Sequence, residues 1–246
     1  MHVLVISDIH ANLPALDSVL EDARAGSRSY QAVWCLGDLV GYGPDPNECV
    51  ERVRQLPNLV CLNGNHDQAA LGLIPLSRFN QDARAAASWT GQVLTDANRS
   101  FLASLSSRLD QELFTLAHGS PRQPVWEYIL DTTTADRNFE AFTSDYCLVG
   151  HSHFPLLFRK ESPQQIARQL AISWEQPAPL SPRMILNPGS VGQPRDLDPR
   201  AAYALLDLDG PTWDARRVAY DVAQVQGRMI QAGLPERQAL RLQAGW

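Results

Sequence analysis

The feature that most constrains this chain is a short apolar run that ends abruptly in polar, chemically active residues. Residues 59–62 read Leu-Val-Cys-Leu, a β-prone run, and Asn-Gly-Asn-His-Asp follows directly. A buried strand cannot continue through such a cluster, so we expect a core strand that stops at the sheet edge and turns on Gly64. The turn would then present Asn65, His66 and Asp67 together. Alone, such a cluster is more typical of a turn with a helix cap than of a catalytic site.

The same arrangement follows four other apolar runs. The polar residues that stand at the ends of these predicted strands are Asp8, His10, Asp38, His118, His151 and His153. The chain has six histidines, and five of them fall in the five clusters, whereas His2 merely opens the first strand. Because the carboxyl ends of strands in an α/β sheet form the ligand crevice, we expect these groups to converge in space.

The order of the predicted elements favours a parallel sheet in the first part of the chain. Strands at residues 2–7, 32–36 and 59–62 alternate with helices at 12–25 and 47–54, which is the rhythm of right-handed β-α-β crossovers. The apolar spacing then predicts helices at 83–94, 97–105 and 131–142, and strands at 112–117 and 146–149.

Beyond residue 150 the pattern changes to shorter β runs with turn-like breaks. We expect strands at 156–159, 166–172, 184–186, 202–208 and 213–219. The tail from 222 to 242 reads as two amphipathic helices that are separated at residues 233–235. Because the sequence contains no internal repeat and no clear linker, residues 1–246 are expected to form a single α/β domain with two sheets and helices outside.

Composition narrows the class of protein. Of the 246 residues, 44% are hydrophobic and 20% charged, which is ordinary for a globular protein. The net charge of −6 and the lack of a basic block make a nucleic-acid polymer an unfavoured partner. No apolar run approaches the ~20 residues of a membrane span, and the N-terminal run is too short for a signal peptide. The unevenly spaced Cys35, Cys49, Cys61 and Cys147 read as reduced core residues, so we expect a cytoplasmic protein.

The side chains at the strand ends are imidazoles, carboxylates and an amide, with no thiolate among them. Such nitrogen and oxygen donors suit Mn²⁺, Fe, Zn²⁺, Co²⁺ or Ni²⁺ better than Ca²⁺ or an iron–sulfur cluster. Leaving His66 aside, seven candidates are too many for one ion but suit two ions that share a carboxylate. Two ions ~3.5–4 Å apart are the arrangement for in-line displacement at phosphorus.

These clusters resemble the five ordered motifs of the calcineurin-like metallophosphoesterase superfamily over roughly residues 1–195. The matching segments are Asp8-Ile9-His10, Gly37-Asp38, Gly64-Asn65-His66-Asp67, His118 and Gly150-His151-Ser152-His153. Residues 41–47 and 187–195 resemble the small prokaryotic phosphodiesterase-like branch, which acts on model phosphate esters and in some members on diadenosine polyphosphates. The resemblance implies a four-layer α-β-β-α sandwich of two mixed sheets with helices outside.

The resemblance also implies a role for each position. The first metal would be held by Asp8, His10 and His153, the second by Asn65, His118 and His151, and Asp38 would bridge both. A hydroxide between the ions would attack phosphorus in line, and Mn²⁺ is the ion that we favour, with Fe, Zn²⁺, Ni²⁺ and Co²⁺ as alternatives. His66 would protonate the leaving oxygen or stabilise the transition state. Asp67 would orient His66 or cap the next helix, and we favour the cap.

Other residues have competing interpretations. Arg122 and Arg195 stand close enough after motif residues to hold a phosphate with a fork of donors, but each is as typical of a protein surface. Tyr42 and Trp126 are candidates for stacking on a nucleobase, although partly buried aromatic residues are commoner. Ser190 lies in a Gly-Ser-Val-Gly turn and is not expected to act as a nucleophile, because no free histidine is left to serve it.

Two functional classes follow. The first is a metal-dependent phosphoesterase that hydrolyses mono- or diesters, with nucleotides such as diadenosine polyphosphates among the candidate substrates. The second is a non-catalytic scaffold or binding subunit that reuses the fold. The complete set of ligand residues and the additional His66 favour the enzyme. We therefore expect a small-molecule phosphate ester as partner and no membrane; the oligomeric state is left open.

Overall fold

The first of two six-stranded sheets contains the three N-terminal strands that are followed by candidate ligand residues. The computed structural model describes residues 1–25 and 29–246. In the order in which they pair, the strands are β3 (Leu59–Cys61), β2 (Ala32–Cys35), β1 (His2–Ile6), β11 (Ala201–Asp207), β12 (Thr212–Val218) and β9 (Ala178–Pro179). β1, β2 and β3 are parallel, so their carboxyl ends meet at one edge, while β11, β12 and β9 run antiparallel.

The second sheet brings the remaining motifs to the same region. Its order is β4 (Arg108–Asp110), β5 (Phe114–Ala117), β6 (Tyr146–Val149), β10 (Met184–Pro188), β7 (Pro155–Arg159) and β8 (Arg168–Leu170). β5, β6 and β10 are parallel. Because Ala117 pairs with Val149, the segments that begin with His118 and Gly150 leave the sheet side by side.

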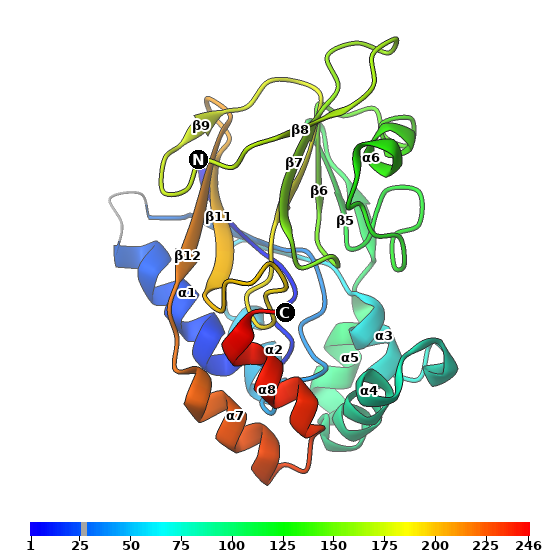
Figure 1. Cartoon of the computed structure of the whole chain (residues 1–246), viewed down its shortest axis with the longest axis vertical. Coiled ribbons are helices and arrows are strands. Elements are labelled where there is room, and N and C mark those ends of the chain that lie inside the picture. The colour runs from blue at the N-terminus through cyan, green and yellow to red at the C-terminus, as the bar shows by residue number, and fades with distance from the viewer. Residues whose placement is uncertain (26–28) are drawn as a thin grey trace.

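Alternation along the strands explains why the two sheets stack. Val3 and Val5 belong to the core between the sheets, whereas Leu4 and Ile6 belong to the core under the helices. α1 (Leu13–Ala25) and α2 (Pro46–Arg54) cover the outer face of the first sheet, and α6 (Thr132–Asn138) covers the second (Figure 1). The predicted four-layer α-β-β-α architecture of mixed sheets is confirmed.

The other helices gather at the end of the molecule where the motifs lie (Figure 1). They are α3 (Asn65–Ala70), a 3₁₀ turn (Leu76–Arg78), α4 (Gln81–Val93), α5 (Asp96–Ser104), α7 (Val222–Gln231) and α8 (Glu236–Ala244). α4, α7 and α8 share a separate apolar core that includes Tyr42 and Phe79. Among the helices of the described residues, none has the length and apolarity that a membrane span requires.

Most predicted elements are present, and the differences have physical causes. The helix predicted at 131–142 ends at Asn138. The prediction was too long because buried Phe139 and Phe142 continue the apolar spacing past the helix end. The strand predicted at 112–117 begins only at Phe114, and the one at 166–172 spans only Arg168–Leu170. β4, β9 and α3 were not predicted, since each is six residues or shorter and lacks an apolar pattern of its own.

Candidate metal centre

Backbone hydrogen bonds tie the strand-end segments to one another. The N–H of Asp8 donates to the carbonyl of Gly37 at 3.0 Å, and the N–H of His10 donates to that of Asp38 at 3.0 Å. In the second sheet, the N–H of Gly150 donates to the carbonyl of His118 at 2.8 Å. The motifs are thus held together by the main chain before any side chain contributes.

Many of the candidate ligands have a left-handed backbone. The φ angles are 53° at Asp8, 49° at His10, 52° at Asp38, and 63° at both His151 and His153. Side chains other than glycine rarely adopt this region, although Asp and His tolerate it better than most. Such strain persists where the surrounding structure imposes it, and it concentrates at functional sites. Five strained residues in one cluster therefore indicate a site rather than ordinary strand-end turns.

The turn at Gly64 differs in detail from the expectation. Gly64 has φ −110° and forms the N-cap of α3, so the turn needs no left-handed glycine. Glycine is nevertheless required for space, because a Cβ here would lie 2.1 Å from Asp38 Oδ1. Asp67 closes the turn, since its Oδ2 accepts from the N–H of Gly64 at 2.9 Å and its Oδ1 from that of Val40 at 3.0 Å. The interpretation of Asp67 as a helix cap is confirmed.

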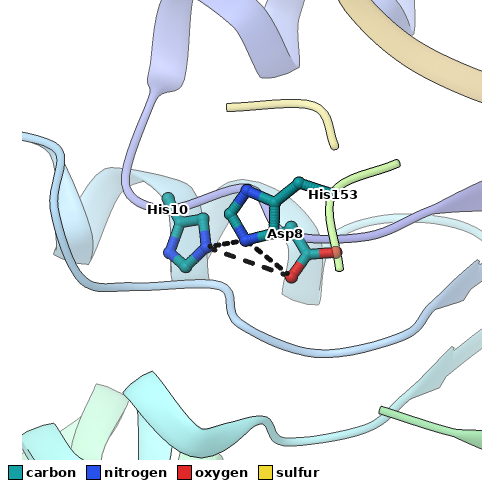
Figure 2. A group of neighbouring side chains, drawn as sticks. All are labelled: Asp8, His10 and His153. Carbon is teal, nitrogen blue, oxygen red and sulfur yellow. Dashed lines mark hydrogen bonds and ion pairs between the residues drawn. The ribbon is translucent and has the colours of Figure 1, made fainter. Parts of the chain in front are cut away.

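Asp8, His10 and His153 form the first group, with their side chains pointing toward one another (Figure 2). The Nε2 atoms of His10 and His153 are 3.1 Å apart, and His153 Nε2 is 3.4 Å from Asp8 Oδ1. Each ring donates Nδ1–H to a main-chain carbonyl: His10 to Val40 at 3.2 Å and His153 to Gln193 at 2.5 Å. With Nδ1 protonated, both Nε2 atoms carry lone pairs that face each other, an arrangement that a cation between them would stabilise.

Asp38, His118 and His151 form the second group, and Asn65 adjoins it. His118 Nε2 lies 3.3 Å from Asp38 Oδ2 and 3.2 Å from Asn65 Oδ1, and its Nδ1 faces the carbonyl of Leu36 at 2.9 Å. Asp38 Oδ2 is also 3.8 Å from His10 Nε2. One carboxylate oxygen therefore lies between the two groups.

Electrostatics agree with a pair of cation sites. Burial lowers the pKa of His10 and His153 well below the ordinary value and that of His151 to about 3, which leaves neutral, ligand-competent imidazoles. Burial raises the pKa of Asp8 to about 7. Burial also opposes ionisation of Asp38, but His118 and the other imidazoles around it together outweigh burial and hold the pKa of Asp38 below its usual range.

Three buried atoms of the two groups have no hydrogen-bond partner among the described residues. They are Asp8 Oδ1, Asp38 Oδ2 and His151 Nε2. Leaving such polar atoms without a partner in the interior is costly, and all three are ligand atoms that divalent transition metals bind. The residues therefore fit two divalent ions.

His66 lies beside the two groups without belonging to either. It sits in the first turn of α3, and its N–H donates to Asp38 Oδ1 at 2.8 Å. Its ring is packed against His10 at 5.0 Å, Tyr42 at 4.4 Å and Phe79 at 5.1 Å between centroids. Burial lowers the pKa of His66 to about 4.

The two arginines singled out in the sequence lie in different surroundings. Arg195 is linked to the first group through Gln193, whose carbonyl accepts from His153 Nδ1 at 2.5 Å. After burial, the charge of Arg195 is the next cause that lowers the pKa of His153. Arg195 Nη2 donates to Gln193 Oε1 at 3.0 Å. Arg122 instead faces Glu127, with Nη1 3.5 Å from Oε1. The structure brings Arg195, and not Arg122, to the centre.

One aromatic residue at the centre was missed in the sequence. The ring of Tyr128 stacks on that of His151 at 4.0 Å and 9°, and the residue is 45% exposed. Glu127 anchors this loop, because its Oε2 accepts from Ser120 at 2.7 Å and from Asn138 at 2.8 Å. The only signal was an aromatic pair, Trp126 and Tyr128, soon after a motif histidine. Trp126 itself lies farther out, between Phe79 and Arg78.

Comparison with known proteins identifies the family. The calcineurin-like phosphoesterase superfamily domain matches residues 1–210. The chain belongs to this superfamily. An uncharacterized protein of Methanocaldococcus jannaschii is 36% identical over 249 residues, which cover 99% of this chain and 98% of that protein. A metallophosphoesterase from Sphaerobacter thermophilus has a crystal structure with a TM-score of 0.90 and 42% identity, over 100% of this chain and 99% of that one.

A shorter match links the chain to a nucleotide hydrolase. It is 41% identical to a symmetrical bis(5'-nucleosyl)-tetraphosphatase of Erwinia tasmaniensis over 68 residues, 27% of this chain and 24% of that protein. The resemblance noted in the sequence is thus confirmed at the level of the superfamily. Family membership and the two residue groups together imply a phosphoesterase fold that uses divalent metals.

Proposed function

We propose that this protein is a dinuclear metal-dependent phosphoesterase that hydrolyses phosphate mono- or diesters. The observation that carries the proposal is the pair of side-chain groups that share Asp38 Oδ2 and leave three buried donor atoms unsatisfied. A protein that used the fold only for packing would gain nothing from such unpaired polar atoms.

The first ion would be held by Asp8, His10 and His153, and the second by Asn65, His118 and His151, with Asp38 as the bridge. When bound, the ions would polarise the phosphoryl oxygens and acidify a water toward a pKa of ~7. Mn²⁺ is the ion that we favour in function, with Fe, Zn²⁺, Ni²⁺ and Co²⁺ compatible with the same donors.

The chain's other side chains would handle the substrate. His66 is proposed to protonate the leaving oxygen, or to stabilise the charge that develops on it, because it adjoins both groups without a metal-binding partner. Arg195 is proposed to hold a non-bridging phosphate oxygen, which its position beside the first group supports. Arg122 remains a weaker candidate, because Glu127 already faces its guanidinium.

The proposed substrates are small phosphate esters, with nucleotides such as diadenosine polyphosphates as the leading candidates. The similarity to the Erwinia tasmaniensis tetraphosphatase supports this choice. We further propose that residues 1–246 act as one domain, since α7 and α8 share an apolar core with α4. The four cysteines are free, which supports a cytoplasmic location.

A non-catalytic scaffold is the alternative function. It needs no leaving-group acid and no strained ligand backbone, so intact His66 and the left-handed Asp8 and His151 count against it.

The decisive experiment measures hydrolysis of p-nitrophenyl phosphate and of its bis ester by chelator-treated protein before and after addition of manganese. Metal content is determined on the same preparation. Activity restored by manganese with about two ions per chain would support the proposal. Two bound ions without turnover would call for a panel of nucleotides, and neither metal nor turnover would favour the scaffold.

A further inference from the structure

Two buried glutamines connect the metal centre to helix α8, which lies beyond the part of the chain that matches the superfamily domain. Gln193, whose carbonyl accepts from His153, donates Nε2–H to Gln238 Oε1 at 3.2 Å. Arg195 donates to Gln193 Oε1 at 3.0 Å, and Arg241 donates to Gln238 Oε1 at 3.3 Å. The amide pair thus holds one arginine at each end.

The C-terminal end of α8 is fixed to the loop that follows Arg195. The N–H of Leu197 donates to the carbonyl of Gly245 at 2.7 Å. Gly245 has φ 66°, and a Cβ there would lie 2.7 Å from the backbone of Asp198. Figure 1 shows the end of α8 beside this loop. Arg195 and Arg241 are therefore held near each other by main-chain contacts as well as by the glutamines.

The arginines of this region differ from the neighbouring Arg216 and Arg217 of β12. Arg216 and Arg217 pair with Asp214 and Asp196. Within the described residues, no acidic side chain forms an ion pair with Arg195, Arg237 or Arg241.

Arg241 Nε donates to the main-chain oxygen of Trp246, so the two linked arginines are not equally satisfied. Arg195 Nε is buried and has no hydrogen-bond partner among the described residues. Burial, followed by the charge of Arg195, lowers the pKa of Arg241 to about 10. Adjacent, partly buried guanidinium groups that no acidic side chain pairs with favour the binding of an anion.

A cavity of about 380 Å³ lies beside Arg241, the outer of the two linked arginines. Arg237, Arg241 and Trp246 line one side, and residues 80–82 at the start of α4 line the other. Asp82 is the one carboxylate among the lining residues, and its Oδ2 already accepts from Gln238 at 3.3 Å. The cavity thus offers a ligand two guanidinium groups and three side-chain amides.

We propose that Arg195 and Arg241, joined by Gln193 and Gln238, form an anion subsite that binds a second phosphate of the substrate, one that is not attacked. Arg237 extends the subsite outward. The guanidinium groups supply forks of donors that match phosphate oxygens. The subsite selects phosphate esters or anhydrides that carry at least one further phosphate over simple monoesters. This inference rests on the proposed phosphoesterase function.

The test compares the binding of inorganic tripolyphosphate and orthophosphate to the manganese-loaded protein by calorimetry, at a fixed concentration of free manganese. Arg241→Gln should reduce the preference for tripolyphosphate by about 10- to 100-fold, the usual worth of charge-assisted hydrogen bonds. Arg237→Gln, at an exposed position that tolerates substitution, should reduce it by about threefold. The matched control is Arg24→Gln, which removes the same charge from an exposed site on α1 and should leave the preference unchanged.

An unchanged preference in both variants would overturn the subsite, and so would an equal loss of affinity for both ligands. The readout does not depend on turnover. A preference lost in Arg241→Gln would establish the subsite even if no ester were hydrolysed, whereas hydrolysis with an unchanged preference would refute the subsite and leave the phosphoesterase standing.

Discussion

The two ligand groups are built from the same kinds of side chain but are supported differently. In the first group, His10 and His153 both donate Nδ1–H to main-chain carbonyls and are almost fully buried. In the second group, His118 is anchored in this way, whereas His151 stacks under the half-exposed ring of Tyr128. The first group is therefore preorganised by the core, and the second depends partly on a surface loop. We infer that substrate approaches over the second group.

The largest effect is expected where the two groups join. Asp38→Ala should remove both ions and abolish hydrolysis, because Asp38 Oδ2 lies between His10 and His118. Metal analysis of the purified variant checks this, with Asp38→Asn as a control that keeps the side-chain volume. Full retention of one ion would show that the groups are independent.

The next largest effect separates chemistry from metal binding. His66→Ala should keep both ions and yet lose on the order of 10²–10⁴ in kcat, the usual worth of general acid–base catalysis. Steady-state kinetics together with metal analysis measures both quantities, and His2→Ala, at the half-exposed start of β1, is the matched control. Unchanged turnover would remove His66 from the mechanism.

A smaller effect tests the asymmetry itself. Tyr128→Ala should lower the affinity for the second ion by about 2- to 10-fold, as expected for the loss of one aromatic stack, and leave the affinity for the first ion unchanged. Tyr128→Phe keeps the ring and should behave as the wild type. Stepwise manganese titration distinguishes the two ions. If both weakened equally, the loop would support the centre as a whole.

The smallest effect concerns the strands that lead into the second group. Cys35 and Cys61 are directly paired neighbours on β2 and β3, just before Asp38 and Asn65. Cys35→Ser should lower the free energy of unfolding by about 1–3 kcal/mol, because it buries a hydroxyl. Metal content should not change. Denaturant unfolding and metal analysis check this, and a loss of metal would mean that the thiols take part in the centre.

Much of the fold was predictable because local patterns and the tertiary structure agree. β1, β6 and the two tail helices appear close to where the apolar spacing placed them. The elements that were missed owe their existence to neighbours: two of the three residues of β4 are charged, so this strand forms only because β5 pairs with it, and α3 is a six-residue helix that is held by Asp67. Short elements of this kind have no periodicity that a sequence could reveal.

The residues of the candidate site likewise divide into those that the sequence could predict and those that it could not. Asp8, Asp38 and His118 were predictable because parallel strands carry their carboxyl-end residues to one edge whatever the surrounding loops do. Tyr128 and Arg241 were not, because their positions depend on how a loop folds around Glu127 and how α8 packs on a distant turn.

The sequence by itself therefore determined the class of chemistry, since the order of strands and the residues that follow them specify a nitrogen and oxygen donor set at a sheet edge. Only the tertiary structure decided which ligand atoms face each other, which are left unsatisfied, and which arginines beside them lack an acidic side-chain partner. The reason is physical: periodicity acts over a few residues along the chain, whereas the contacts of Gln193 with Gln238 and of Tyr128 with His151 join segments that become neighbours only after packing.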